Sequence, residues 1–205
     1  MPLKTPVDLT RAAMGVGLSL TPDEAERLVA YAQLLQRWNQ RINLTASRTL
    51  ADILERQVLD ALMADLLPWP GTVLHVVDIG SGAGLPGLLI ALRHPAFFVT
   101  TLERVGKKAS FQQEDGAQHA AGVGHQRYDA ALARAFADLA HTLPLAARLL
   151  RPGGLLRTFK GRKLPEELAA IPPDVRKLFR DEVVQHPYAV PETQVAGVLV
   201  QFQRI

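Results

Sequence analysis

The N-terminal third of the chain places apolar side chains at helical spacing. Residues 21–24 (TPDE) have the form of a capping box with proline at the first helical position, and they predict a helix start. The apolar positions that follow define one face: Leu28, Ala32, Leu35, Trp38 and Ile42. A second helix is expected between Thr49 and Pro68, with these residues facing inward: Ile53, Leu54, Val58, Ala61 and Leu62. We therefore expect residues 1–70 to form an N-terminal helical cap.

From Val73 onward, short apolar runs replace this spacing. Runs at 73–79, 97–103, 128–135 and 155–160 have the length of buried strands, and segments of helical character lie at 85–93, 107–121, 139–150 and 165–170. Residues 151–154 (RPGG) predict a turn into the fourth run, and 177–190 with 197–205 predict a closing antiparallel pair. Strands that alternate with helices favour a doubly wound α/β sheet, here over residues 71–205, with the whole chain as one compact unit.

A glycine-rich segment, residues 78–87 (DIGSGAGLPG), follows the first expected strand. Glycines let the backbone approach a ligand, and the helix that starts there offers free N–H groups. From Gly82 the segment also satisfies G-x-G-x-x-G, with Glu103 at the end of the next strand, which is the dinucleotide fingerprint. The pattern alone leaves a nicotinamide cofactor and S-adenosylmethionine open.

Two features favour S-adenosylmethionine. Asp78 lies before the first glycine, where a carboxylate can face the charged amino end of that ligand, and the dinucleotide pattern has no use for an acid there. The chain is also too short for a separate hydride-acceptor domain, and Glu103 can accept hydrogen bonds from both ribose hydroxyls. The expected cofactor-binding residues are Asp78, Gly80, Ser81, Gly82, Gly84, Leu85, Pro86, Glu103 and Arg134.

Composition narrows the class of protein further. The chain has 205 residues, 48% of them hydrophobic, and no cysteine, so disulfides, thiolate metal sites and a cysteine nucleophile are excluded. Scattered histidines indicate no metal site. No apolar run reaches the roughly 18 residues that span a bilayer, and the N-terminus lacks a signal-peptide pattern. We expect a cytoplasmic protein without membrane contact.

Basic side chains crowd one stretch although the net charge is only +3. The stretch contains Arg151, Arg157, Lys160, Arg162 and Lys163. The planar fork of arginine suits phosphate, so an RNA-facing surface is one interpretation, and a solvated basic face is the other. Arg134 and Lys160 end neighbouring strands at the edge of the sheet where such folds bind ligands, so both are candidate site residues.

An ordered series of motifs carries a resemblance to a known family. It comprises W-N-x-x-x-N-L-T at 38–45, D-A-L at 60–62, the glycine segment, G-K-K at 106–108, R-A at 134–135, P-G-G at 152–154 and F-K-G at 159–161. From about residue 20 onward, the chain resembles the small-subunit ribosomal RNA guanine-N7 methyltransferases, the RsmG or glucose-inhibited division protein B family.

This resemblance implies a class I methyltransferase fold and methyl transfer from S-adenosylmethionine to guanine N7 in 16S ribosomal RNA, near the decoding site. The implied partner is 16S ribosomal RNA or a precursor of the small ribosomal subunit, and the implied state is a monomer. Guanine N7 has a lone pair and no proton, so orientation can supply most of the rate gain without a general base. Candidate catalytic residues are Arg134, Lys160 and Asn39, and Asn39 could equally cap its helix.

Two departures from the family pattern matter. Gln57 stands where the family usually has histidine, so no imidazole role is transferred. The stretch 109–127 is short, and two glycines in 122–127 disfavour a strand, so we expect the edge strand beyond 97–103 to be missing or vestigial. The sheet would then have six strands instead of seven and leave the adenine end of the cofactor more exposed.

Other functions stay open from the sequence alone. A methyltransferase acting on a small molecule or a protein is one alternative, and a catalytically silent RNA-binding or ribosome-assembly protein is another. A nicotinamide oxidoreductase is the third.

Overall fold

Helices fill the chain before the first strand in the computed structural model, which describes residues 2–73, 75–103, 106, 108, 112 and 127–205. Helix α1 (Pro6–Met14) was not anticipated from the sequence, whereas α2 (Pro22–Asn39) begins with the expected capping box of Thr21 and Glu24. The second expected helix is one continuous helical rod of four pieces: α3 (Leu50–Ile53), the π-helical η1 (Leu54–Leu59), α4 (Asp60–Leu62) and the 3-10 turn η2 (Met63–Asp65). All five residues expected to face inward from this rod are fully buried.

The strands form a six-stranded sheet among the described residues, in the order β2-β1-β3-β4-β6-β5. The strands are β1 (His75–Ile79), β2 (Phe98–Leu102), β3 (Tyr128–Ala133), β4 (Leu150–Lys160), β5 (Val184–Ala189) and β6 (Ala196–Gln203). Strands β2, β1, β3 and β4 are parallel, and β6 and β5 close the sheet in antiparallel pairing. The doubly wound fold class and the closing pair are therefore confirmed.

The predicted turn at 151–154 lies inside β4 and does not precede it. Tyr128 pairs with Leu150, but Ala130 pairs with Leu155, so the register shifts across this stretch. Gly153 takes a left-handed φ of 80°, which a glycine adopts without steric cost. The predicted turn is therefore wrong: these residues form an irregular part of β4, and the strand begins earlier than the sequence predicts.

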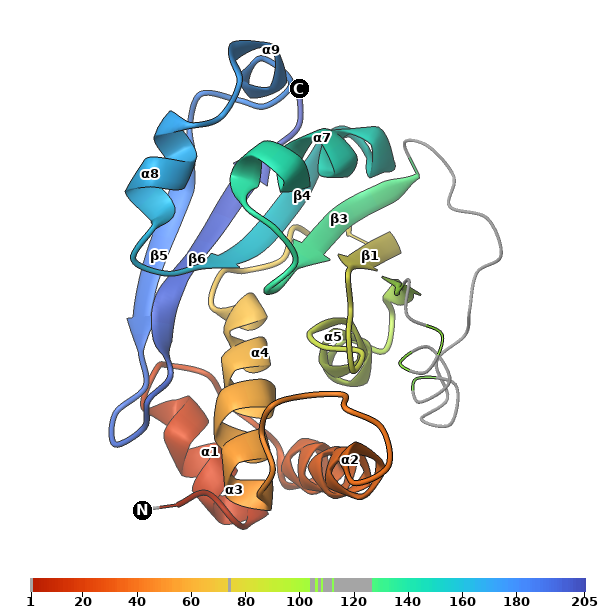
Figure 1. The fold of residues 1–205 in the computed structure, drawn as a ribbon, viewed down its shortest axis with the longest axis vertical. Coiled ribbons are helices and arrows are strands. Elements are labelled where there is room, and N and C mark those ends of the chain that lie inside the picture. The colour runs from red at the N-terminus through yellow and green to blue at the C-terminus, as the bar shows by residue number, and fades with distance from the viewer. Residues whose placement is uncertain (1, 74, 104–105, 107, 109–111, 113–126) are drawn as a thin grey trace.

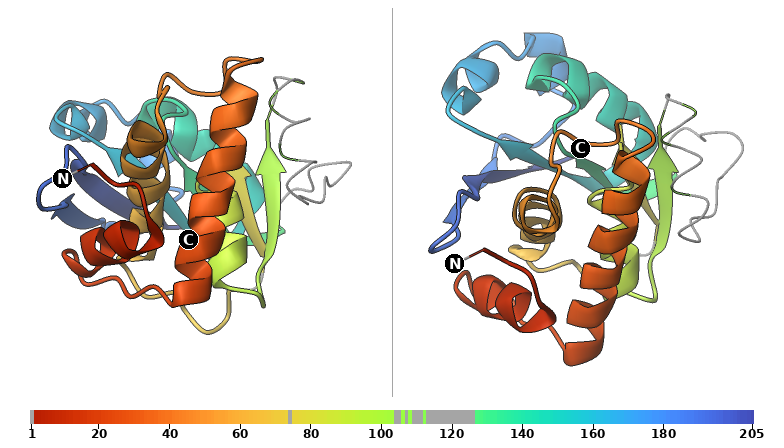
Figure 2. Two further views of the ribbon diagram at one scale, coloured as in Figure 1. Left: turned by 90° about the horizontal axis from the view of Figure 1, so that it is seen from below. Right: turned by 60° about the horizontal axis from the view of Figure 1, so that its bottom comes forward.

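Helices cover both faces of the sheet (Figure 1). Helices α2, α4 and α5 (Gly87–Arg93) lie on one face. Helices α7 (Leu139–Leu149) and α8 (Leu164–Ala169) lie on the other, with α9 (Pro173–Arg176) beyond them. The second pair of views shows the same layering (Figure 2). One buried apolar cluster joins the N-terminal helices to Leu85 and Leu89 and to Leu199 of β6, so these helices share a core with the sheet.

Arg157 corrects the interpretation of residues 151–163 as one basic surface. Its side chain is fully buried and donates to the carbonyl oxygens of Ala64 and Pro68, each at 2.7 Å, while its guanidinium lies 3.7 Å from the ring centroid of Trp69. Burial lowers the pKa of Arg157 to about 10, so it stays charged at neutral pH. Successive side chains along a strand point to opposite faces of the sheet, and the side chain of Arg157 points into the protein.

The expectation of a missing edge strand concerns a stretch that lies largely outside the described residues. The same holds for most of the helix expected at 107–121. No helix in the described ranges has the length and apolar character needed to cross a membrane.

Candidate functional site

The glycine loop, residues 80–86, leaves β1 at the carboxyl edge of the sheet and enters α5. The backbone N–H groups of Gly80 and Ser81 donate to the carbonyl oxygen of Leu102 at 2.9 and 3.1 Å. A Cβ at Gly80 would meet the ring of Phe136, whereas at Gly82 the nearest atom of a described residue, chain neighbours aside, is a backbone oxygen 4.0 Å away. Gly82 is only partly buried, and its φ of 59° is a left-handed conformation that glycine adopts without steric cost. A ligand can therefore approach the backbone closely at Gly82.

Asp78 of β1 is buried beneath this loop. Its side chain has no exposed surface, and its Oδ2 accepts a hydrogen bond from the N–H of Gly87 at 2.8 Å. Burial raises the pKa of Asp78 to about 7, although the Gly87 N–H and the charge of Arg134 act in the opposite direction. The other carboxylate oxygen, Oδ1, has no hydrogen-bond partner. Asp78 is thus a buried acid with one oxygen available to a donor.

Unpartnered polar atoms gather around the glycine loop. Among the described residues, the buried side-chain atoms without a partner are Asp78 Oδ1, Thr101 Oγ1 and Gln112 Oε1. Thr101 pairs in register with Asp78, and Gln112 Nε2 donates to Ser81 Oγ at 2.9 Å and to the Gly82 carbonyl at 2.8 Å. A buried polar group without a partner costs about 1–3 kcal/mol. The residues around the loop therefore fit a polar ligand that bonds to these atoms.

The other residues expected to bind the cofactor either hydrogen-bond to the glycine loop or its neighbours, or lie in the hydrophobic core. Glu103 lies after β2, and its Oε2 accepts a hydrogen bond from the N–H of Gly82 at 2.8 Å, so this acid braces the loop. Ser81 is buried and bonds to Gln112. Leu85 and Pro86 are buried as well, with Leu85 in the core beneath the N-terminal helices. They can offer a ligand only backbone atoms.

Arg134 follows β3 at the same edge, and its guanidinium is held by three groups. Nη1 bonds to Asp60 Oδ2 at 3.0 Å and to the Arg56 carbonyl at 3.3 Å, and Nη2 donates to Gln57 Oε1 at 2.7 Å. Tyr188 of β5 donates to the other oxygen of Asp60 at 2.9 Å, and burial raises the pKa of this tyrosine. We call these four side chains the arginine clamp: Arg134, Gln57, Asp60 and Tyr188.

Asn39 organises the loop after α2. Its Oδ1 accepts from the N–H groups of Leu44 and Thr45 at 2.9 and 3.0 Å, and its Nδ2 donates to the Ser47 carbonyl at 2.7 Å. Ser47 Oγ in turn accepts from Gln57 Nε2 at 3.2 Å. Asn39 is buried, so the structure supports the helix-ending interpretation and connects it to the arginine clamp.

Lys160 ends β4, and its Nζ is already bound. It lies 2.7 Å from Glu167 Oε2 and 2.8 Å from the Ala137 carbonyl, and only 6% of the side chain is exposed. Arg162 and Lys163 are exposed just beyond it. Their contact with RNA remains a prediction.

Several residues at the site were missed from the sequence. Tyr31 of α2 donates from its hydroxyl to the Ala83 carbonyl at 2.7 Å, Phe136 covers Gly80, and Gln112 braces the loop. None of them belongs to a glycine or charge pattern, so only the fold reveals them. The sequence marks Asp60 and Gln57 only as motif positions, and the D-A-L motif is the signal available for Asp60.

Solved structures share this fold. A predicted O-methyltransferase from Agrobacterium tumefaciens has a TM-score of 0.55 at 21% identity, over 71% of this chain and 80% of that chain. A protein described as SAM-dependent methyltransferases from Methanosarcina mazei has a TM-score of 0.52 at 14% identity, over 69% of this chain and 99% of that chain. The fold is that of the class I S-adenosylmethionine-dependent methyltransferases.

Sequence comparison identifies the family within that class. Residues 24–186 match the model of the family described as rRNA small subunit methyltransferase G. A ribosomal RNA small subunit methyltransferase G from Aromatoleum aromaticum is 38% identical over 205 residues, which covers 92% of this chain and 94% of the relative. The chain belongs to the rRNA small subunit methyltransferase G family.

Proposed function

We propose that this protein transfers a methyl group from S-adenosylmethionine to N7 of a guanine in 16S ribosomal RNA, near the decoding site. The observation that carries the proposal is the pairing of an open glycine loop with the unpartnered oxygen of Asp78 in a chain of this family. The substrate is the ribosomal RNA itself or a precursor of the small subunit. We further propose that the enzyme acts as a monomer in the cytoplasm.

The chain offers matching groups to each part of the cofactor. Asp78 Oδ1 would accept from the ammonium group, and the exposed backbone at Gly82 would lie against the ligand. Glu103, at the end of β2, stands where a ribose hydroxyl can donate to it. When bound, S-adenosylmethionine supplies a methyl group that its sulfonium centre already activates.

Guanine N7 carries no proton, so the protein needs no general base for the transfer. The protein then contributes by holding guanine N7 in line with the methyl group of the cofactor and by excluding other orientations of the base. The arginine clamp fixes Arg134 at the edge of the sheet, where its charge is close enough to lower the pKa of Asp78. A cation that donated to N7 would block the attack, so we assign Arg134 to O6 or to a phosphate.

The direct test maps N7-methylguanine in 16S ribosomal RNA from cells with and without this protein. Methylation that depends on the protein is expected, and an unchanged methylation pattern contradicts the proposal. Transfer in vitro to protein or to a small molecule, with none to ribosomal RNA or small subunits, would favour another substrate.

A pair of variants tests the cofactor site. Gly82→Ala places a methyl group at the open face of the loop, so calorimetry should show at least tenfold weaker S-adenosylmethionine binding. Gly17→Ala is the matched control, because Gly17 also has a positive φ of 81° and open space around a Cβ but lies between α1 and α2. Equal loss in both variants would attribute the effect to backbone strain.

A further inference from the structure

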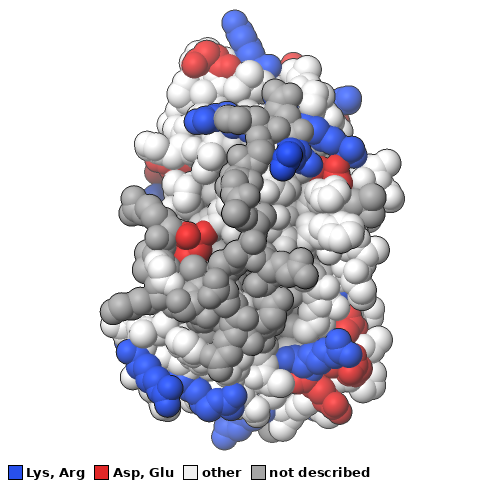
Figure 3. Space-filling view, turned by 90° about the vertical axis from the view of Figure 1, so that its right-hand side faces the viewer, with Lys and Arg blue, Asp and Glu red and all other residues white. Residues whose placement is uncertain are grey.

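The end of α2 and the loop after it carry positive charge without acidic neighbours in sequence. Arg37, Arg41 and Arg48 are exposed, and no Asp or Glu occurs from residue 28 to residue 51. None of the three forms an ion pair with a described residue. Within the described part of the chain, Arg48 donates only to neutral oxygens, the Asn39 carbonyl at 3.4 Å and Asn43 Oδ1 at 3.2 Å. Figure 3 shows Lys and Arg side chains at the bottom of one face, the end of the molecule where α2 lies in Figure 1.

This segment is attached to the candidate site at two points. Tyr31 bonds to the Ala83 carbonyl in the glycine loop, and Arg37 lies about 9 Å further along the same helix. The loop after the helix is tied by Asn39 to Ser47, and Ser47 bonds to Gln57 of the arginine clamp. The backbone that carries these arginines is therefore attached to the parts of the chain that hold Arg134 and Gly82.

The end of α2 favours positive charge but leaves it without an anionic partner. Arg37 lies in the last turn of α2, and Arg48 donates to the carbonyl of Asn39, the last residue of that helix, so the negative end of the helix dipole stabilises both charges by about 0.3–1 kcal/mol each. A guanidinium has five N–H donors, and Arg48 donates to only two oxygens of the described residues. These exposed arginines can therefore donate to the oxygens of an anion from outside the protein.

We propose that Arg37, Arg41 and Arg48, here called the arginine rim, bind backbone phosphates of the ribosomal RNA substrate. Arginine forks match phosphate oxygens, and contacts of this kind position a substrate without reading its sequence. The rim lies on the N-terminal helices, apart from the basic residues after β4. The identity of the RNA rests on the proposed function, whereas the phosphate chemistry rests on the rim itself.

The test is the salt dependence of binding to deproteinised 16S ribosomal RNA. Replacing all three residues by glutamine (Arg37→Gln, Arg41→Gln, Arg48→Gln) should reduce the slope of log affinity against log salt by about two to three, at roughly 0.7–0.9 per phosphate contact. At 0.1 M salt the affinity should fall about a hundredfold. S-adenosylmethionine affinity should stay unchanged, because the rim does not touch the glycine loop.

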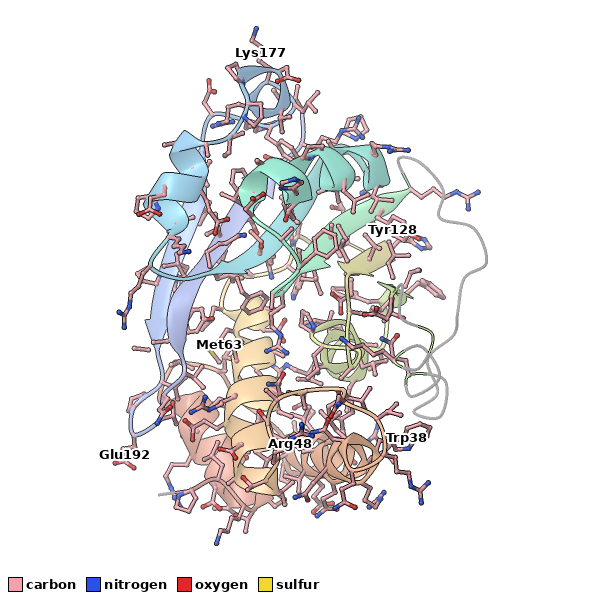
Figure 4. The ribbon with its side chains drawn as sticks, viewed as in Figure 1. Trp38, Arg48, Met63, Tyr128, Lys177 and Glu192 are labelled. Atoms are coloured by element: carbon pink, nitrogen blue, oxygen red, sulfur yellow. The ribbon has the colours of Figure 1, made fainter. Side chains whose placement is uncertain are left out.

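The matched control removes the same charge elsewhere, with Arg148→Gln, Lys177→Gln and Arg180→Gln, all exposed. Figure 4 shows Lys177 at the opposite end of the molecule from Arg48. An equal loss in this control, or an unchanged slope in the rim variant, overturns the proposal. Loss of binding to small subunits alone, with unchanged affinity for deproteinised RNA, would assign the rim to a ribosomal protein and overturn it too.

Two further measurements keep the result interpretable. The double variant Arg37→Gln, Arg41→Gln leaves the hydrogen bonds of Arg48 intact and should retain the wild-type melting temperature. It should show about two thirds of the reduction in slope that the triple variant shows. If the wild type methylates no ribosomal RNA but the rim variant still loses slope, the proposed function fails and the rim stands. If the wild type methylates ribosomal RNA and the rim variant keeps the wild-type salt slope, the proposal for the rim is wrong and the proposed function stands.

Discussion

The hydroxyl of Tyr31 donates a hydrogen bond to the carbonyl oxygen of Ala83, 52 residues away in the chain. This bond joins the longest N-terminal helix to the glycine loop, and both groups are buried. The helical segment therefore helps to hold the glycine loop in addition to covering the sheet.

Tyr31→Phe should lower the free energy of unfolding by about 1–2 kcal/mol, because a buried carbonyl oxygen loses its donor. S-adenosylmethionine affinity should decrease severalfold as the loop gains freedom. Urea denaturation and calorimetry measure the two effects. Tyr128→Phe is a control on a buried tyrosine of β3. Unchanged cofactor binding in Tyr31→Phe would show that the loop holds its shape without the helix.

Asp78 should make both stability and cofactor binding depend on pH. Its pKa is raised from 3.8 to about 7, so the folded protein retains a proton that the unfolded chain releases. The resulting stabilisation is complete below about pH 4 and is lost as the pH rises through 7. In the proposed binding mode the ammonium of the cofactor bonds to the Asp78 carboxylate, so affinity should fall about tenfold per pH unit below 7.

Asp78→Asn removes both dependences. The variant should be more stable than the wild type at pH 8 and should bind S-adenosylmethionine weakly at every pH. Denaturation and calorimetry between pH 5 and 9 test this, and binding by the wild type should release a proton into the buffer. A pH-independent wild-type affinity would contradict the assignment of Asp78 to the ammonium group.

The arginine clamp predicts different effects for its members. Arg134→Ala should reduce turnover about a hundredfold. Since the charge of Arg134 lowers the pKa of Asp78, cofactor affinity should also decrease near pH 7 and should match the wild type only at higher pH. Gln57→Glu keeps the size of the side chain and offers Arg134 a charged acceptor, so Arg134 stays in place and turnover should remain within a few fold. Steady-state kinetics with ribosomal RNA separates kcat from KM. If Arg134→Ala retains full turnover, the clamp stabilises the fold only.

Arg157 should matter for stability alone. Arg157→Met leaves the carbonyl oxygens of Ala64 and Pro68 without their donor, so the free energy of unfolding should fall by about 3 kcal/mol. The salt slope of RNA binding should not change, because the side chain is buried. A reduced slope in a folded variant would restore Arg157 to the RNA-facing surface.

Patterns of local origin were predictable from the sequence. Three predicted features come from residues close together in the sequence, and the structure confirms them. They are the capping box at Thr21, the inward face of the second helical rod and the positions of the four parallel strands. Asp78 and the glycine loop were recognised for the same reason, since a strand end, glycines and a helix start are adjacent in sequence.

Features that depend on distant contacts were missed or misread. The sequence of β4 reads as a basic stretch, but the pleat turns Arg157 inward, and Glu167 neutralises Lys160. The sequence predicts a ligand role for Glu103, which stays a prediction, but it does not reveal that the Gly82 N–H donates to this carboxylate. The order of charged residues along the chain does not show which group will pair with each of them in the folded protein.

The arginine clamp also says something about the order of folding. Its side chains come from the rod before β1, from the end of β3 and from β5, so it forms only after long loops have closed. Because closing long loops costs entropy, we expect the clamp to form with the native sheet and not before it. Heating should therefore leave no active form that lacks the sheet.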